Sequence, residues 1–166
     1  MSSEDFEKFS VYGFSIDYPS TCYVELSPKS RREVGDVVFR FPNKDKVYVT
    51  WEGLEKARKK FRTVDEQAEH SINQVTKSTS VRRVERLSRD SLTINSHKAV
   101  YNRLKLDEIP AGFLLRTKST THETHSVHLH CENSSRFFVI YSLLSSNPPE
   151  NFQSIMMSIV NSFRCH

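Results

Sequence analysis

A run of histidines at residues 121–131, THETHSVHLHC, is the densest group of metal-ligating side chains in the sequence. Zinc, copper and nickel bind imidazole nitrogens and thiolate sulfurs, so both residue types in this run are candidate ligands. The run contains four histidines and closes on a cysteine: His122, His125, His128, His130 and Cys131. Their spacing decides whether several of them can hold one ion together.

The segment HETH at 122–125 is similar to the zinc-protease motif HExxH but is one residue too short. That motif requires a helix that places two histidines four positions apart, with the glutamate acting as general base. The residues that follow alternate between apolar and polar types, which is typical of a β-strand. The spacing therefore excludes a metalloprotease of this kind.

A strand at this position points Val127, Leu129 and Cys131 toward the core and His128 and His130 toward the opposite face. Such an i, i+2 histidine pair can grip one ion, but zinc sites use three or four protein ligands.

Two further histidines of the run do not complete the site. His122 shares the face of His128 but lies about 20 Å away along an extended strand, and His125 has the opposite parity. A third ligand must come from a neighbouring strand, a bent loop at His122 or a second subunit. We expect two exposed imidazoles and no cofactor, with weak metal binding at His128 and His130 as the alternative.

The three cysteines, Cys22, Cys131 and Cys165, form no CxxC pair, and we expect three free thiols in a reducing compartment. Cys22 and Cys131 lie in strand-like segments and are expected to be small core residues. The sequence also lacks GxxxxGK, GxGxxG and GxSxG motifs. We therefore expect no enzymatic activity.

The net charge of +4 is concentrated in residues 55–89, which hold ten basic and five acidic side chains. This segment is the candidate site for nucleic acid or another polyanion, with these residues: Lys56, Arg58, Lys59, Lys60, Arg62, Arg82, Arg83, Arg86 and Arg89. Only Phe61 is interleaved with the first cluster, which argues against stacking on single-stranded bases. The alternative is a solvated charged face.

Two helices are expected, at residues 64–77 and 149–163. Thr63 and Glu66 have the spacing of a capping box, and apolar residues follow at helical intervals. In the second helix Asn147 is the expected cap and Pro148 suits the first turn.

Strands account for most of the remaining chain. Hairpins are expected in 34–51, and in 91–106 with a turn at Asn95–Ser96; further strands are expected at 112–119, 125–131 and 136–144. In the last, RFFVIYSLL, both alternating sets are largely apolar, which predicts a central strand covered on both faces. Short turns require mainly antiparallel pairing. The expected fold class is α/β (α+β), a three-layer α/β/α sandwich with about six or seven strands.

The length of 166 residues suits one domain, 1–166, with 1–9 as an N-terminal tail. The acidic, polar start MSSEDFEKFS does not read as a secretory signal, and no apolar run approaches the roughly 20 residues that cross a bilayer. We expect a cytoplasmic protein without membrane insertion.

Three stretches resemble the PsbP-like family: YGFSIDYPSTCYVEL at 12–26, INSHKAVYNRL at 94–104 and SIVNSFR at 158–164. Cys22 stands where that family usually has tryptophan. The family includes the extrinsic subunit of the plant oxygen-evolving complex and a nuclear Ran-binding protein. The resemblance implies a non-catalytic protein-interaction or accessory module, a monomer or weak dimer with an unidentified protein partner. Nucleic acid is the alternative partner, and metal binding by the His122–His130 run is the second alternative.

Overall fold

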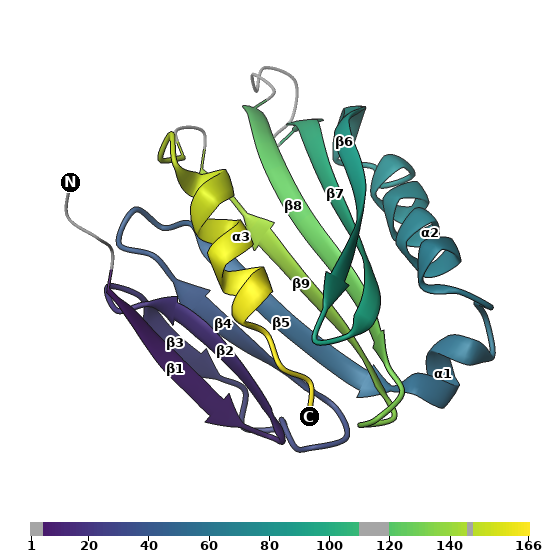
Figure 1. Ribbon diagram of the computed structural model, residues 1–166. Helices are drawn as coiled ribbons and strands as arrows, with labels where there is room; N and C mark the ends of the chain where they lie inside the picture. The colour runs from purple at the N-terminus through teal and green to yellow at the C-terminus, as the bar shows by residue number, and fades with distance from the viewer. Residues whose placement is uncertain (1–4, 110–119, 146–147) are drawn as a thin grey trace.

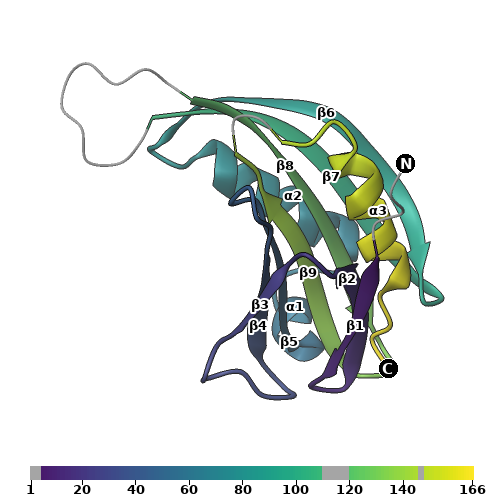
Figure 2. The same cartoon turned by 90° about the vertical axis from the view of Figure 1, so that its left-hand side faces the viewer.

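A seven-stranded antiparallel sheet forms the middle layer of a three-layer α/β/α sandwich (Figure 1). The computed structural model describes residues 5–109, 120–145 and 148–166. Helices α1 and α2 lie on one face of the sheet, and α3 lies on the other with a two-stranded sheet of β1 and β2 (Figure 2). The strands are β1 Phe6–Val11, β2 Phe14–Pro19, β3 Tyr23–Leu26, β4 Gly35–Arg40, β5 Lys46–Gly53, β6 Val81–Ile94, β7 His97–Glu108, β8 Thr120–Cys131 and β9 Arg136–Leu143. The helices are α1 Leu54–Arg58, α2 Val64–Thr76 and α3 Phe152–Ser162.

The strand order in the main sheet is β3-β4-β5-β9-β8-β7-β6, and every neighbouring pair is antiparallel. The expected hairpins β4–β5 and β6–β7 are confirmed. The strands expected at 125–131 and 136–144 pair with each other as β8 and β9, and β9 is the central strand. Asn95 and Ser96 turn the β6–β7 hairpin with φ angles of 49° and 67°, as a two-residue turn between twisted strands requires. The strand expected at 112–119 lies outside the described residues.

The main core lies between the sheet and α3. Its large side chains come from alternate positions of the central strands and from one stripe of α3, and rings stack edge to face, as Phe138 does with Phe163 at 4.9 Å. Arg164 pairs with Ser15 through two backbone hydrogen bonds of 2.9 Å, which fixes the chain after α3 against β2.

Helix α2 begins as the capping signature predicts. The Thr63 hydroxyl accepts from the Glu66 N–H at 3.2 Å, while the Glu66 carboxylate accepts from the Arg62 N–H at 2.7 Å. The helix packs on β6, β7 and β8 and does not extend over β3, β4 and β5. No helix in the described part of the chain is long and apolar enough to span a bilayer.

Three local expectations are corrected. Helix α3 begins at Phe152 rather than at 149, with Asn151 at its N-cap; the expected cap Asn147 lies outside the described residues. Helix α1 is short, and its charged sequence did not indicate a helix. Residues 6–9, assigned to a tail, pair with β2 because Phe9 is a buried core residue.

Strand β9 is covered completely on one face only. Phe138 and Ile140 are buried under α3, but Phe137, Val139 and Tyr141 on the other face are only partly buried, and Leu143 is 44% exposed. The expectation of cover on both faces is therefore wrong for the α2 side, because α2 stands over β6–β8 instead of β9.

Candidate functional site

The histidine pair His128 and His130 points toward α2, on the face that strand alternation predicted. His128 Nε2 lies 3.1 Å from Ser71 Oγ, and His130 Nε2 is hydrogen-bonded to Gln67 Oε1. His128 is 3% exposed, so the expectation of two exposed imidazoles is wrong. The reason is that α2 packs directly over this part of β8.

The other two histidines of the run are also engaged. His125 is buried on the α3 side, where its Nδ1 lies 2.6 Å from the Tyr101 hydroxyl and its ring packs against Phe152. His122 Nε2 lies 3.3 Å from a Glu108 carboxylate oxygen. The run therefore divides between both faces of the sheet.

Burial determines the protonation of the run. It lowers the pKa of His125 and of His128 from 6.5 to about 4, and it lowers the pKa of His130, with Arg58 as a second cause. These imidazoles are neutral at pH 7. His128 and His130 join α2 to the sheet by hydrogen bonds, whereas His125 is hydrogen-bonded to Tyr101 of the neighbouring strand and packs its ring against Phe152 of α3. The structure gives them packing roles and does not assemble a metal site from them.

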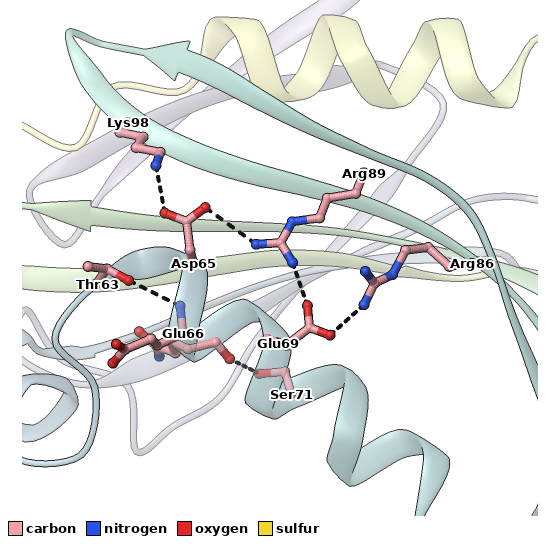
Figure 3. A network of polar contacts seen from close by, with 9 residues as sticks. Thr63, Asp65, Glu66, Glu69, Ser71, Arg86, Arg89 and Lys98 are labelled. Atoms are coloured by element: carbon pink, nitrogen blue, oxygen red, sulfur yellow. Dashed lines mark hydrogen bonds and ion pairs between the residues drawn. The ribbon is translucent and has the colours of Figure 1, made fainter.

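Four of the nine basic candidates, Lys56, Arg58, Arg86 and Arg89, form ion pairs with neighbouring acids. On β6, Arg86 and Arg89 both contact Glu69 of α2, and Arg89 also contacts Asp65, which accepts from Lys98 of β7 (Figure 3). These contacts fix α2 over the β6–β7 hairpin.

The other basic side chains lie in separate places. Lys56 pairs with Glu52 and Arg58 with Glu132 at the α1 end of the sheet, where Lys59, Lys60 and Arg62 follow. Arg83 lies beside Asp107, on the face of β6–β7 opposite α2. The nine residues do not form one continuous basic face.

An open trough lies on the α2 side of the sheet, over the parts of β5 and β9 that α1 and α2 leave uncovered. It consists of two adjoining hollows of about 590 and 390 Å³, which share Thr50 and Tyr141; we call them together the sheet trough. Its floor carries the rings of Tyr48 and Tyr141, stacked at 4.8 Å with 4° between their planes. Burial and the neighbouring Tyr48 raise the pKa of Tyr141, so this phenol is neutral at pH 7.

The rim of the sheet trough is held by the segment between β3 and β4. Trp51 Nε1 donates to the Arg31 carbonyl at 2.9 Å, and Ser30 Oγ donates to the Asp36 carbonyl at 2.9 Å. Gly35 permits this close approach, because a Cβ there would lie 2.6 Å from the Trp51 ring. Lys29, Arg31, Asp36 and Glu52 supply charges of both signs around the aromatic floor.

By sequence, the chain matches no family model and no curated protein. Its structure is similar to that of cyanobacterial PsbP (CyanoP) from Synechocystis sp. PCC 6803, with a TM-score of 0.66 and 10% identity, covering 100% of this chain and 95% of that one. The chain has the PsbP-like fold. The Saccharomyces cerevisiae Ran-binding protein Mog1p is similar too, with a TM-score of 0.62 and 10% identity over 98% of this chain and 96% of Mog1p. At this identity the likeness shows the fold alone.

Within this PsbP-like fold the cysteines differ from expectation. Cys131 and Cys165 form a disulfide, so the expectation of three free thiols is wrong. Strand β8 and the segment after α3 bring the two sulfurs together, although the residues are 34 positions apart in the sequence. Cys22 is a partly buried residue packed against the main core.

Two features of functional interest were not found from the sequence. The sheet trough depends on where α2 lies across the sheet, which no local pattern reports. A second group, His97 and His166 beside the two disulfide cysteines, combines residues from three separate segments. The sequence carried one signal for the trough: the second face of the strand RFFVIYSLL is also apolar, and an apolar strand face has to pack against another part of the protein or against a partner.

Proposed function

We propose that this chain is a non-catalytic protein-interaction module and that its partner docks in the sheet trough. The observation that carries the proposal is the aromatic floor of the trough, Tyr48 and Tyr141, which no helix covers completely. The neighbouring residues of β9 on the same face, Phe137 and Val139, are apolar and only partly buried. Protein interfaces characteristically combine an aromatic centre with a polar rim, which is the composition found here. The similarity to Mog1p, a Ran-binding protein, supports a protein as the ligand class.

The chemistry of the trough defines the partner. Its floor suits an apolar or aromatic side chain from a protein segment that lies across β5 and β9, while Lys29 and Asp36 at the rim suit charges of either sign beside it. The hydrogen bonds from Trp51 and Ser30 hold the rim in place, so little ordering of the site is required on binding.

Site-specific photocrosslinking tests the proposal. The photoreactive analogue benzoylphenylalanine is placed at Tyr48 in the trough and, as a control, at Ser154, which is exposed on α3 across the sheet. In cells, position 48 should capture one defined protein that position 154 does not. Capture from both positions alike, or from neither, would contradict docking in the trough.

A pair of matched tyrosine variants then measures the contribution of the floor. With the captured partner purified, Tyr48→Ala should weaken binding by tenfold or more, about 1.4 kcal/mol, which is the range of an interface hot spot. Tyr23→Ala removes the same side chain from a site 70% exposed on edge strand β3 and should leave the affinity unchanged. The reverse result would assign the partner to the sheet edge.

A further inference from the structure

Four metal-ligating side chains meet beside the end of β8, on the α3 side of the sheet. His97 begins β7, Cys131 ends β8, and Cys165 and His166 follow α3. One ligand atom from each residue lies within 4.8 Å of the other three. Of the His122–His130 run and its closing cysteine, only Cys131 belongs to this group, so the cluster is separate from the pair His128 and His130.

The geometry points to a zinc site formed by His97, Cys131, Cys165 and His166 when the two cysteines are reduced. Two sulfurs and two imidazole nitrogens are a common ligand set of four-coordinate structural zinc. With the usual zinc–ligand bond lengths, a tetrahedral site places sulfur about 3.6 Å from nitrogen. Cys131 Sγ lies 3.6 Å from His97 Nε2 and 3.7 Å from His166 Nδ1, and Cys165 Sγ lies 3.3 Å from His166 Nδ1.

The surroundings of the cluster favour an ion over four unrelated side chains. The amide nitrogen of Asn95 lies 3.5 Å from Cys165 Sγ, where it can donate to a ligating thiolate as outer-shell groups do. His166 is exposed and both cysteines are buried, which leaves entry from solvent on the histidine side.

The backbone positions the two ligands that follow α3. Arg164 is paired with Ser15, and the Cys165 carbonyl accepts from Arg136 Nη2 at 3.3 Å. His97 and Cys131 sit on neighbouring antiparallel strands, so their Cα positions are fixed by the sheet. On reduction the two sulfurs separate from a disulfide to the about 3.8 Å that two thiolates on one zinc ion have.

The disulfide and the zinc site are two states of the same cysteines. In the cell a dithiol supplies two electrons and two protons, and it becomes a disulfide while Cys131 and Cys165 become thiols. Zinc then replaces the two thiol protons, which are released to solvent. Both states tie β8 to the segment after α3; the metal state also includes the start of β7.

Metal retention after reduction tests this site. The chain is purified without an affinity tag, reduced with a water-soluble phosphine, given zinc and desalted; the phosphine takes oxygen from water, whose two protons go to the thiols. We expect one retained zinc per reduced chain and none for the disulfide form. Cobalt in place of zinc should give the visible bands of a tetrahedral ion and a thiolate charge-transfer band.

Variants separate the cluster from the histidine run. His97→Asn and Cys165→Ser should lose the ion, while the matched variants His128→Asn and Cys22→Ser should keep it. The assignment would be overturned if His97→Asn or Cys165→Ser still retained zinc, or if His128→Asn lost it. It would also be overturned if the reduced wild type did not retain one zinc per chain.

A measurement on the wild type avoids any folding defect of the variants. Zinc should slow alkylation of Cys131 and Cys165, read by mass spectrometry, without slowing that of Cys22. Equal rates with and without zinc would also overturn the site.

Discussion

Arg136 Nη1 donates to the backbone carbonyl of Tyr12 at 2.6 Å and so joins the central strand to the turn of the N-terminal hairpin. Arg136 is 3% exposed, and its guanidinium carbon lies 4.9 Å from the centre of the Phe138 ring. Its two outer nitrogens reach carbonyls in three segments of the chain: Tyr12, Gly13, Arg32 and Cys165. One charged fork thus fixes the β1–β2 turn, the β3–β4 segment and the residues after α3.

Arg136→Lys should lower the free energy of unfolding by about 3 kcal/mol, because an ammonium cannot reproduce the planar fork and buried carbonyls lose their donors. Urea denaturation at pH 7 measures the loss. Arg164→Lys is the matched control: Arg164 is exposed, and its guanidinium donates to the nearby Asn161 and Phe163 carbonyls. That variant should change stability by less than about 0.5 kcal/mol. Equal losses in the two would show that Arg136 does not hold the segments together.

Acid should weaken the fold through His125 and His128. Both are buried, and the pKa of each falls from 6.5 in the unfolded chain to about 4 in the folded one. Between these values the unfolded chain binds more protons, so stability decreases as pH falls, by up to about 1.4 kcal/mol per pH unit for each residue. Hydrogen bonds from Lys98 and Arg86 lower the pKa values of Asp65 and Glu69, respectively. The stability that these two carboxylates contribute is therefore lost at still lower pH.

A urea series from pH 7 to pH 4 reads this slope. His128→Asn removes one titrating group and should flatten the slope in that window, whatever it does to stability at pH 7. His70→Asn changes an exposed histidine of α2 and should leave the slope as in the wild type. If the slope of His128→Asn equalled that of the wild type, the His128 imidazole would bind its proton in the folded chain as readily as in the unfolded chain, which would contradict the lowered pKa.

The capped start of α2 and its ion pairs fix the helix over the β6–β7 hairpin (Figure 3). Thr63→Ala should cost about 1 kcal/mol through the lost cap. Glu69→Ala removes the acceptor shared by Arg86 and Arg89 and should cost about 1 kcal/mol or less at low salt, and less still in high salt, because these groups are partly exposed.

Glu85→Ala is the control for charge alone, since Glu85 lies on the opposite face of β6. Thermal unfolding at two salt concentrations compares the three variants. A salt-independent loss in Glu69→Ala would point to packing instead of charge.

Much of this fold could be predicted from the alternation of residues along strands and from the capping and periodicity of helices, because both patterns are local in the sequence. Alternation placed Cys131 in the core and His128 on the other face, and Thr63 with Glu66 marked the start of α2. The same patterns could not report that α2 covers β8 rather than β9. That position depends on contacts between residues distant in the sequence, such as Glu69 with Arg86 and Ile72 with Leu104. The residue types were visible in the sequence, but their partners were not.

The cluster of His97, Cys131, Cys165 and His166 was also hard to predict, because its residues are distant from one another in the sequence. His97 and Cys131 are 34 residues apart, and Cys131 and Cys165 are again 34 residues apart. Such separations carry no ligand-spacing motif like CxxC, whereas the histidines of the dense run at 122–130 are close in sequence and are therefore visible as candidate ligands. The sheet brings His97 beside Cys131, and the segment after α3 adds the remaining two residues.

Binding of polyanions at the α1 end of the sheet should be weak. With Arg86 and Arg89 paired to α2 and Arg58 paired to Glu132, the basic side chains remaining at the α1 end are Lys59, Lys60 and Arg62. Contacts there would be to phosphate, so binding at low salt should fall in the non-specific range of about 10⁻⁴–10⁻⁶ M and be lost at physiological salt. Fluorescence anisotropy with labelled single-stranded and duplex DNA measures it.

Charge reversal shows whether the α1 end carries that weak binding. Lys59→Glu with Lys60→Glu should weaken binding to every sequence alike and reduce its salt dependence, because fewer counterions are released. Lys8→Glu with Lys105→Glu makes the same change in net charge at exposed positions elsewhere, and should weaken binding less. Sequence-selective binding that survives physiological salt would contradict the prediction, since phosphate contacts alone carry no sequence information.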